Sequence, residues 1–327
     1  MDVSASDGSR YDPEFVRFFD VAHTGAHVRA ISQYVAAGEL ADLEHMSARS
    51  VIVYSANAED AAVVNLVVSA LEVPCPVMVT SRFPLFLGPL DILLVATDGS
   101  LNAEEQATAA LTEASRRGAR VLLVQSSAEL RDETRAPVLP VPPTAGAAQN
   151  PVRLAYAVAA VARSLTLDKR VVSEELERVA DVLDEDLMAL SPQRDLSVNP
   201  AKALRYSTAD ACVVHTATPE FQTAAEVIAR VWQRWGIPCF AADHTALQAL
   251  SHDNPVSNDI FHDPFLDDAP EMLPLKVVVW GAEGAPSVAF ASATYAQHCA
   301  DANLGALATA ARFIVRAAAA AIFELDE

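Results

Sequence analysis

The sequence is poor in positive charge: 23 Lys and Arg stand against 43 Asp and Glu, for a formal net charge of −20. The basic residues are scattered and form no run. Because such a surface would repel the phosphate backbone of a nucleic acid, we expect no nucleic-acid partner. The negative net charge argues less strongly against a small phosphate ligand than against a nucleic acid, because a local nest of backbone N–H groups can bind phosphate inside an acidic protein.

Cysteine and nucleotide-binding motifs are also scarce. Cys75, Cys212, Cys239 and Cys299 lie far apart, and no CxxC pair occurs, so a zinc site is not expected. Free thiols beside predicted strands behave as small hydrophobes. There is no GxGxxG, GxxxxGKS/T or GxSxG motif, so nucleotide-binding and hydrolase functions gain no support, and no cofactor is predicted.

Long apolar runs are missing as well. Residues 1–10 carry no apolar signal region, and the Ala-rich helix predicted near the C-terminus is interrupted by Arg312 and Arg316. We therefore expect a cytoplasmic protein with no membrane partner. The chain is 52% apolar and only 6% aromatic, and much of the apolar content is alanine, so closely packed helices are expected in a globular protein.

What the sequence does contain is a regular alternation of short apolar runs and helical stretches. Helices are expected within 13–46, over about 59–71 and over about 102–117, the last ended by Gly118. Strand and helix alternating with short turns predict a parallel sheet with helices on both faces. The strands of this first half are predicted at 50–54, 73–79, 91–96 and 120–124.

The second half repeats this pattern. Strands are predicted at 210–215, 236–240 and 275–280, with a helix over 219–235 and a last helix over 303–323. Corresponding strands open with a Val-Pro-Cys run ending at Cys75 and an Ile-Pro-Cys run ending at Cys239, and the turn 281–284 corresponds to 97–100. An internal repeat of this kind predicts two similar α/β domains.

We place the domain boundary near residue 145. Residues 1–145 would form N-terminal helices and the first domain, and residues 146–327 a helical connection, over 151–190, and the second domain. Each is expected to be a three-layer αβα domain, a parallel sheet flanked by helices, and 327 residues suit two domains of ordinary size. The segment 251–271, rich in His, Asp, Asn and Pro, predicts a long irregular loop.

Several short motifs resemble those of the bifunctional phosphoglucose/phosphomannose isomerases, which carry two sugar isomerase (SIS) domains. The resemblance spans roughly residues 10 to 325, and it implies a homodimer that binds a sugar phosphate. It also implies aldose–ketose isomerisation of glucose 6-phosphate or mannose 6-phosphate to fructose 6-phosphate. The motifs are Gly88–Asp91, Ser100–Glu105, Arg117–Val121, the Val141–Pro142 segment leading to Pro151–Arg153, and Asn199–Lys202.

The resemblance implies the positions of the site residues. Members of this family bind phosphate at a helix N-terminus, where exposed N–H groups and the helix dipole favour an anion. A carboxylate transfers the proton, a histidine opens the ring and an arginine stabilises the enediolate. The matching candidates here are Asp243, Arg153, His244 and His252 for catalysis, and Ser55, Asn57, Ser100 and Asn102 for the phosphate and sugar.

Some positions depart from the family pattern. Asp98 and Ala103 replace hydroxyl residues in the phosphate loop, and Ala58 replaces a serine after the first strand. A carboxylate facing a phosphate is repulsive, and a lost donor removes a hydrogen bond. Asp243 is one methylene shorter than the family glutamate, no histidine occurs at 248–250, and the last helix has no lysine.

Two other clusters contain metal-ligating residue types. His23 and His27 are four residues apart on a predicted helix, a spacing that can hold a metal. Gly25 lies between them and no third ligand is evident, so a surface helix is the preferred interpretation. The oxygen-rich segment 251–271 lacks the spacing of a calcium loop, so no metal site is predicted.

Two functional hypotheses remain open on the sequence. The first is an isomerase of this family whose activity is weak, altered or lost. The second is a non-catalytic sugar-phosphate sensor or a protein-interaction scaffold, which the several departures at one site favour on chemical grounds.

Overall fold

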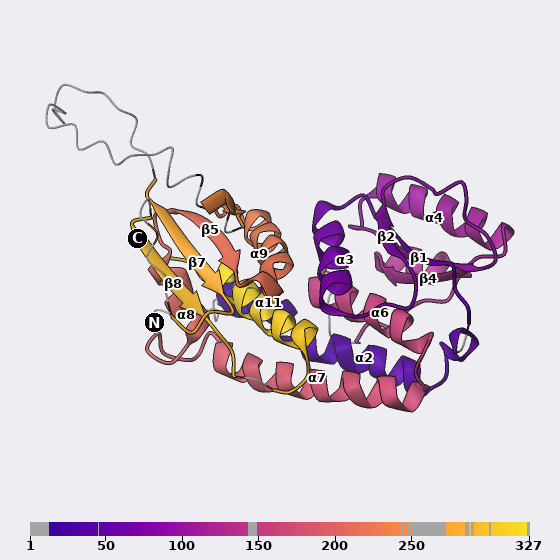
Figure 1. The fold of residues 1–327 in the computed structure, drawn as a ribbon, viewed down its shortest axis with the longest axis horizontal. Helices are drawn as coiled ribbons and strands as arrows, with labels where there is room; N and C mark the ends of the chain where they lie inside the picture. Colours follow the sequence, from indigo (N-terminus) through magenta and orange to yellow (C-terminus); the bar gives the residue numbers. More distant parts are fainter. Residues whose placement is uncertain are drawn as a thin grey trace, which may run out of the picture.

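Two four-stranded parallel sheets form the framework of the protein (Figure 1). The computed structural model describes residues 13–44, 46–142, 149–243, 245–247, 249, 273–284, 288, 291–300 and 302–325. The first sheet contains β1 (Ser50–Tyr54), β2 (Val77–Thr80), β3 (Asp91–Ala96) and β4 (Arg120–Gln125). The second contains β5 (Cys212–Ala217), β6 (Cys239–Ala241), β7 (Leu275–Trp280) and β8 (Ala293–Gln297).

Among the described residues, no helix has the length and apolar character needed to cross a membrane.

Helices cover and connect the two sheets. The helices are α1 (Pro13–Ala22), α2 (Thr24–Ala36), α3 (Ala58–Ala70), α4 (Leu101–Arg116), α5 (Ala128–Glu133), α6 (Pro151–Ser164), α7 (Lys169–Leu190), α8 (Pro200–Ser207), α9 (Gln222–Arg234) and α11 (Ala306–Ile322), with 3-10 turns at Ala41–Leu43 and Pro219–Phe221.

The inner strands of the first sheet are buried on both faces. Every residue of β1 and β3 is buried, and Val53 of β1 pairs with Val79 of β2 and Leu94 of β3. Continuous apolar strands of this kind are typical of parallel sheets covered by helices. The predicted α/β fold, with parallel sheets flanked by helices, is confirmed.

The two sheets have the same strand order, β2-β1-β3-β4 and β6-β5-β7-β8, as the internal repeat predicted. Among the described residues within 281–292, between β7 and β8, no helix corresponds to α4. The strand predicted from residue 73 begins at Val77 instead. Pro74 and Pro76 explain this difference, since proline has no N–H to donate to a neighbouring strand.

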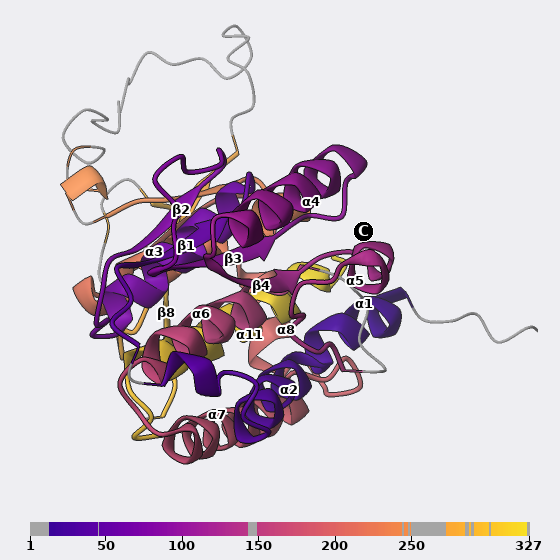
Figure 2. The same ribbon diagram turned by 90° about the vertical axis from the view of Figure 1, so that its right-hand side faces the viewer.

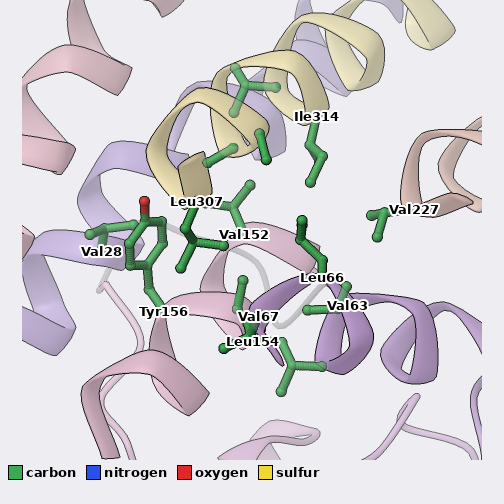
Figure 3. Close-up of a cluster of buried hydrophobic side chains, with 14 of the residues drawn as sticks. Val28, Val63, Leu66, Val67, Val152, Leu154, Tyr156, Val227, Leu307 and Ile314 are labelled. Atoms are coloured by element: carbon green, nitrogen blue, oxygen red, sulfur yellow. The ribbon is translucent and has the colours of Figure 1, made fainter. Parts of the chain in front are cut away.

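A shared helical core joins the two halves. In Figure 1, α3 and α9 face each other between the sheets, and Figure 2 shows α2 and α7 together along one side of the molecule. Figure 3 shows buried side chains of α3, α6, α9 and α11 meeting in one cluster, among them Leu66, Val152, Val227 and Ile314. This continuous apolar core fixes the position of one sheet relative to the other.

The helical stretch predicted over 151–190 is divided into α6 and α7. Residues 165–168 separate the two helices, and Asp168 caps α7 by accepting a hydrogen bond from the N–H of Arg170 at 2.8 Å. The packing of α2 against α7 is reinforced at Arg29, whose guanidinium contacts three carboxylates of α7. These are Glu177 at 2.9 Å, Asp181 at 2.8 Å and Asp184 at 2.8 Å.

Candidate functional site

A cavity of about 430 Å³ opens between the two halves of the chain. Its walls come from α1, α2, the loop after β3, the N-terminus of α6, the C-terminus of α9 and the middle of α11. Ligands of α/β proteins usually bind at the carboxyl ends of the strands, which the cavity reaches through the loop after β3. The charged and polar side chains that line it include Arg17, Asp20, His27, Asp98, Asn150 and Arg234.

Asp98 brings a negative charge to the start of α4. Its Oδ1 accepts a hydrogen bond from the N–H of Ser100 at 2.9 Å. Hydrogen bonds from the hydroxyl and N–H of Ser100 lower the pKa of Asp98, so the carboxylate is ionised at neutral pH. An anion of the protein itself therefore stands beside the helix N-terminus that the family resemblance assigns to phosphate.

The predicted ligand-binding residues Ser100 and Asn102 are both exposed. Ser100 is the N-cap residue of α4, yet its side chain makes no capping hydrogen bond. The side chain of Asn102 accepts a hydrogen bond from Nε2 of Gln106 at 3.1 Å. Neither residue lines the cavity, although Ser100 lies two positions after Asp98, which does.

The predicted sugar-binding residues Ser55 and Asn57 make hydrogen bonds within their own loop. The Ser55 hydroxyl donates to Oδ2 of Asp60 at 2.6 Å and accepts from the N–H of Asn57 at 3.1 Å. Oδ1 of Asn57 caps α3 by accepting from the N–H of Glu59 at 3.0 Å. Both side chains thus stabilise the turn that leads from β1 into α3.

A buried acidic pair in the first turn of α3, Glu59 and Asp60, was not predicted from the sequence. These residues are 5% and 2% exposed. Burial raises the pKa of Asp60 to about 6; the hydrogen bond from Ser55 opposes this shift, and the charge of Asp98 adds to it. Arg234, at the end of α9, partly compensates the charge by donating through Nη1 to Oε1 of Glu59 at 3.1 Å.

His27 faces the same cavity from α2. The residue is 3% exposed, and its Nδ1 has no hydrogen-bond partner in the described structure. Burial, with contributions from Arg153 and His23, lowers the pKa of His27 to about 3, so the imidazole is neutral. The expectation of a surface helix is therefore wrong for His27, and the described residues contain no group of ligands able to hold a metal.

Arg153, the predicted enediolate-stabilising residue, is buried at the start of α6 and is 2% exposed. Its guanidinium donates to backbone carbonyl oxygens from two segments: Val124 at 3.0 and 3.2 Å, Leu139 at 2.9 Å and Pro140 at 2.8 Å. These carbonyls belong to the end of β4 and the proline-rich segment beside it. The contacts favour a structural role, because they direct the guanidinium toward the backbone.

Asp243, the predicted general base, follows β6 and is exposed. Its Oδ1 accepts a hydrogen bond from the N–H of Ala246 at 2.7 Å, which caps the next helical turn. β6 is parallel to β5, so α9 runs from the carboxyl edge of the second sheet, where Asp243 lies, to the opposite edge, where Arg234 lies. The length of α9, about 20 Å, separates Asp243 from the cavity within one chain.

The two predicted catalytic histidines, His244 and His252, lie outside the described residues, as does the segment 251–271. Of the six predicted site residues that the structure describes, none is among those that line the cavity. The cavity instead combines two aspartates, Asp20 and Asp98, and a neutral His27 with two arginines, Arg17 and Arg234. Such a mixture of donors and acceptors suits a polar ligand that is rich in hydroxyl groups.

Solved structures of sugar-phosphate enzymes share this fold over nearly the whole chain. The C-terminal domain of glucosamine-fructose-6-phosphate aminotransferase from Francisella tularensis has a TM-score of 0.54 at 11% identity, covering 97% of this chain and 96% of that one. Tagatose-6-phosphate ketose/aldose isomerase from Escherichia coli has a TM-score of 0.56 at 12% identity, covering 93% and 92%. A glucose-6-phosphate isomerase-like protein from Thermus thermophilus has a TM-score of 0.50 at 17% identity, covering 93% of each chain.

No protein-family model and no curated protein matches the sequence. At the identities of the solved structures, the likeness establishes the fold alone. The chain therefore has the SIS-type α/β fold seen in the solved tagatose-6-phosphate ketose/aldose isomerase.

Proposed function

We propose that the protein binds a sugar phosphate in the cavity between its two halves, with aldose–ketose isomerisation of glucose or mannose 6-phosphate weak or lost. The observation that carries the proposal is the cavity itself, about 430 Å³ in volume and open to the carboxyl edge of the first sheet. This volume is in the range of small-molecule sites, about 300–1,000 Å³. Solved proteins with this fold are named for reactions of glucose 6-phosphate and tagatose 6-phosphate, which supports the ligand class.

The cavity also contains the carboxylates of Asp20 and Asp98, so the position that we propose for the phosphate is the one beside Arg17 and Arg234. Their side chains are 38% and 35% exposed, and each contacts a carboxylate through Nη1, Glu324 and Glu59 respectively. A guanidinium has five N–H donors, so both retain donors that a phosphate can accept. His27 would then accept a hydrogen bond from a sugar hydroxyl, whereas the negative charge of Asp98 would weaken phosphate binding.

Loss of isomerisation is supported by the contacts of Arg153 and by the location of Asp243. The guanidinium of Arg153 donates to backbone carbonyls, so the enediolate would lack the cation that the family resemblance assigns to it. Asp243 lies at the far end of α9 from the cavity. A non-catalytic sugar-phosphate sensor is therefore favoured over an active isomerase, and a protein-interaction scaffold is the alternative.

Assembly and location belong to the same proposal. We propose two SIS-type domains, residues 1–145 and 146–327, in a cytoplasmic homodimer. Phe15, Val16 and Phe19 of α1 are 48%, 55% and 45% exposed, and such an apolar surface is typical of an interface. All four cysteines are unpaired, as expected in a reducing compartment.

Calorimetric titration of the purified protein with glucose 6-phosphate, mannose 6-phosphate and fructose 6-phosphate tests the proposal. We expect saturable binding, weakened about tenfold by Arg234→Gln, because hydrogen bonds to charged groups contribute this much or more. Arg230→Gln is the matched control, an exposed arginine of the same helix. Absence of binding by all three sugar phosphates would overturn the proposal and favour the scaffold function.

A coupled assay that follows fructose 6-phosphate formation separates the sensor from the isomerase. The sensor predicts no turnover in the wild type. Rapid turnover that is lost in Asp243→Ala would instead establish an active isomerase. Its general base would then be Asp243, which lies away from the cavity within one chain.

A further inference from the structure

A second cavity, of about 170 Å³, lies among α6, α7 and the start of α11. It shares no lining residue with the cavity between the two halves. Its walls are mostly apolar and buried, with Ala159 and Ala160 of α6, Leu176 of α7 and Leu307 of α11 all less than 5% exposed. The cavity is smaller than most small-molecule sites, but like them it has a mostly apolar lining with a few polar groups.

The phenol of Tyr156 lines this cavity and is 4% exposed. Its hydroxyl has no hydrogen-bond partner in the described structure. Figure 3 shows the Tyr156 ring beside Leu307 among buried apolar side chains. Burial raises the pKa of Tyr156, so the hydroxyl keeps its proton and can donate. A buried hydroxyl without a partner is unfavourable, and a bound acceptor oxygen would relieve that cost.

Arg163 provides a second donor at the mouth of the cavity. Its Nη2 pairs with a carboxylate oxygen of Glu175 at 2.7 Å, and the two side chains are 33% and 32% exposed. Nε of Arg163 is buried and has no acceptor in the described structure. Arg178 also lines the cavity, so two arginines oppose the single carboxylate of Glu175 and leave the mouth positive.

We propose that this cavity binds a small organic acid, with its carboxylate at Arg163, an apolar body against the alanines and leucines, and a second oxygen that accepts from Tyr156. Tyr156 and Arg163 are two turns apart on α6, about 10 Å along the axis, which suits a ring with oxygen groups at opposite ends. A cavity of about 150 Å³ can hold a benzene ring. This site is independent of the sugar-phosphate proposal.

Calorimetric titration with 4-hydroxybenzoate, benzoate and 4-hydroxybenzyl alcohol tests each part of the site. We expect 4-hydroxybenzoate to bind saturably, benzoate about tenfold more weakly because it lacks the second oxygen, and the alcohol about tenfold more weakly because it lacks the carboxylate. No saturable binding by 4-hydroxybenzoate, or equal affinities for all three compounds, would overturn the proposal.

Variants identify the two donors. Tyr156→Phe removes a hydroxyl that has no partner, so it should fold, and it should abolish the preference for 4-hydroxybenzoate over benzoate. Arg163→Met should weaken both acids about tenfold, whereas Glu175→Gln should strengthen both by removing the competing carboxylate. Tyr295→Phe on β8, which lines neither cavity, is the control. Unchanged affinities in Tyr156→Phe and Arg163→Met would contradict the site.

Discussion

Nη1 of Arg234 donates to Oε1 of Glu59 at 3.1 Å and so joins the end of α9 to the first turn of α3. Glu59 is almost fully buried, and burial raises its pKa while Arg234 lowers it. The arginine therefore compensates part of the cost of burying a carboxylate where the two halves meet.

Arg234→Gln should lower the free energy of unfolding by about 1–2 kcal/mol, because it leaves Glu59 buried without its cation. The loss should be smaller than for a fully buried pair, since Arg234 is about a third exposed. Urea denaturation at pH 7 measures it, and Arg230→Gln is the exposed control. Equal stability of the two variants would show that the ion pair contributes nothing.

Asp60 should make stability depend on pH between about 4 and 6. Its pKa in the folded protein is raised from 3.8 to about 6, so in this window the folded state holds a proton that the unfolded chain has released. The free energy of unfolding therefore falls as pH rises through this window, and the ionised carboxylate is destabilising above it.

Asp60→Asn should accordingly raise the free energy of unfolding at pH 7 by about 1–3 kcal/mol and flatten its dependence on pH between 4 and 6. Urea denaturation at a series of pH values measures both effects. Asp132→Asn replaces an exposed aspartate of α5 and serves as the control. A variant that keeps the wild-type slope would show that another group causes it.

Asp98→Asn should strengthen sugar-phosphate binding about three- to tenfold at low salt, because it removes a negative charge from the wall of the cavity while keeping an acceptor for the N–H of Ser100. The gain should shrink at higher ionic strength, since salt screens the repulsion. Titration at two salt concentrations tests this. An affinity that is independent of both the substitution and salt would place the phosphate out of reach of Asp98.

The fold could be predicted because its signals are local. Aliphatic runs such as 92–96 define buried strands, and the repeated Pro-Cys pairs that end at Cys75 and Cys239 mark corresponding positions in the two halves. The start of α6 was predicted at residue 151, where Asn150 caps the helix by accepting at Oδ1 from the N–H of Arg153. By contrast, α9 and α11 begin three residues later than predicted, at Gln222 and Ala306.

The candidate site was harder to predict because its residues meet only after folding. Glu59 and Asp60 have the appearance of ordinary acidic residues in a first helical turn, where they complement the helix dipole. Only tertiary packing buries them and brings Arg234 to them. For His27 a signal was present: Val28, Ile31 and Val35 lie on the same face of α2, so the histidine belongs to the apolar stripe.

Arg153→Met should lower the free energy of unfolding by about 3–5 kcal/mol, because it leaves the carbonyls of Val124, Leu139 and Pro140 without their donors in a buried setting. Arg153→Lys should recover part of the loss, since one ammonium cannot reproduce the planar guanidinium. Arg135→Gln, at an exposed position, is the control. Wild-type stability in Arg153→Met would argue against a structural role for Arg153 and would again favour the predicted catalytic role.

Two glycines in corresponding turns provide a matched test of packing. Gly99 and Gly281 have φ values of +80° and +82°, so alanine is strained at both. An added Cβ at Gly99 would meet nothing within 4 Å, whereas one at Gly281 would lie 2.6 Å from Phe221 and 2.7 Å from Oγ1 of Thr218. Phe221 has little room to move, because its ring packs edge-on against Phe313 at 5.3 Å.

Gly99→Ala should therefore cost about 1–2 kcal/mol, the strain alone, and Gly281→Ala about 2–5 kcal/mol, because overpacking is added to the same strain. Thermal and urea denaturation of the two variants measure the difference directly. Since the backbone conformation is shared, the extra loss in Gly281→Ala reports the close approach of the turn to Phe221. Equal losses would mean that the second-half turn relaxes freely and that only the left-handed backbone requires glycine there.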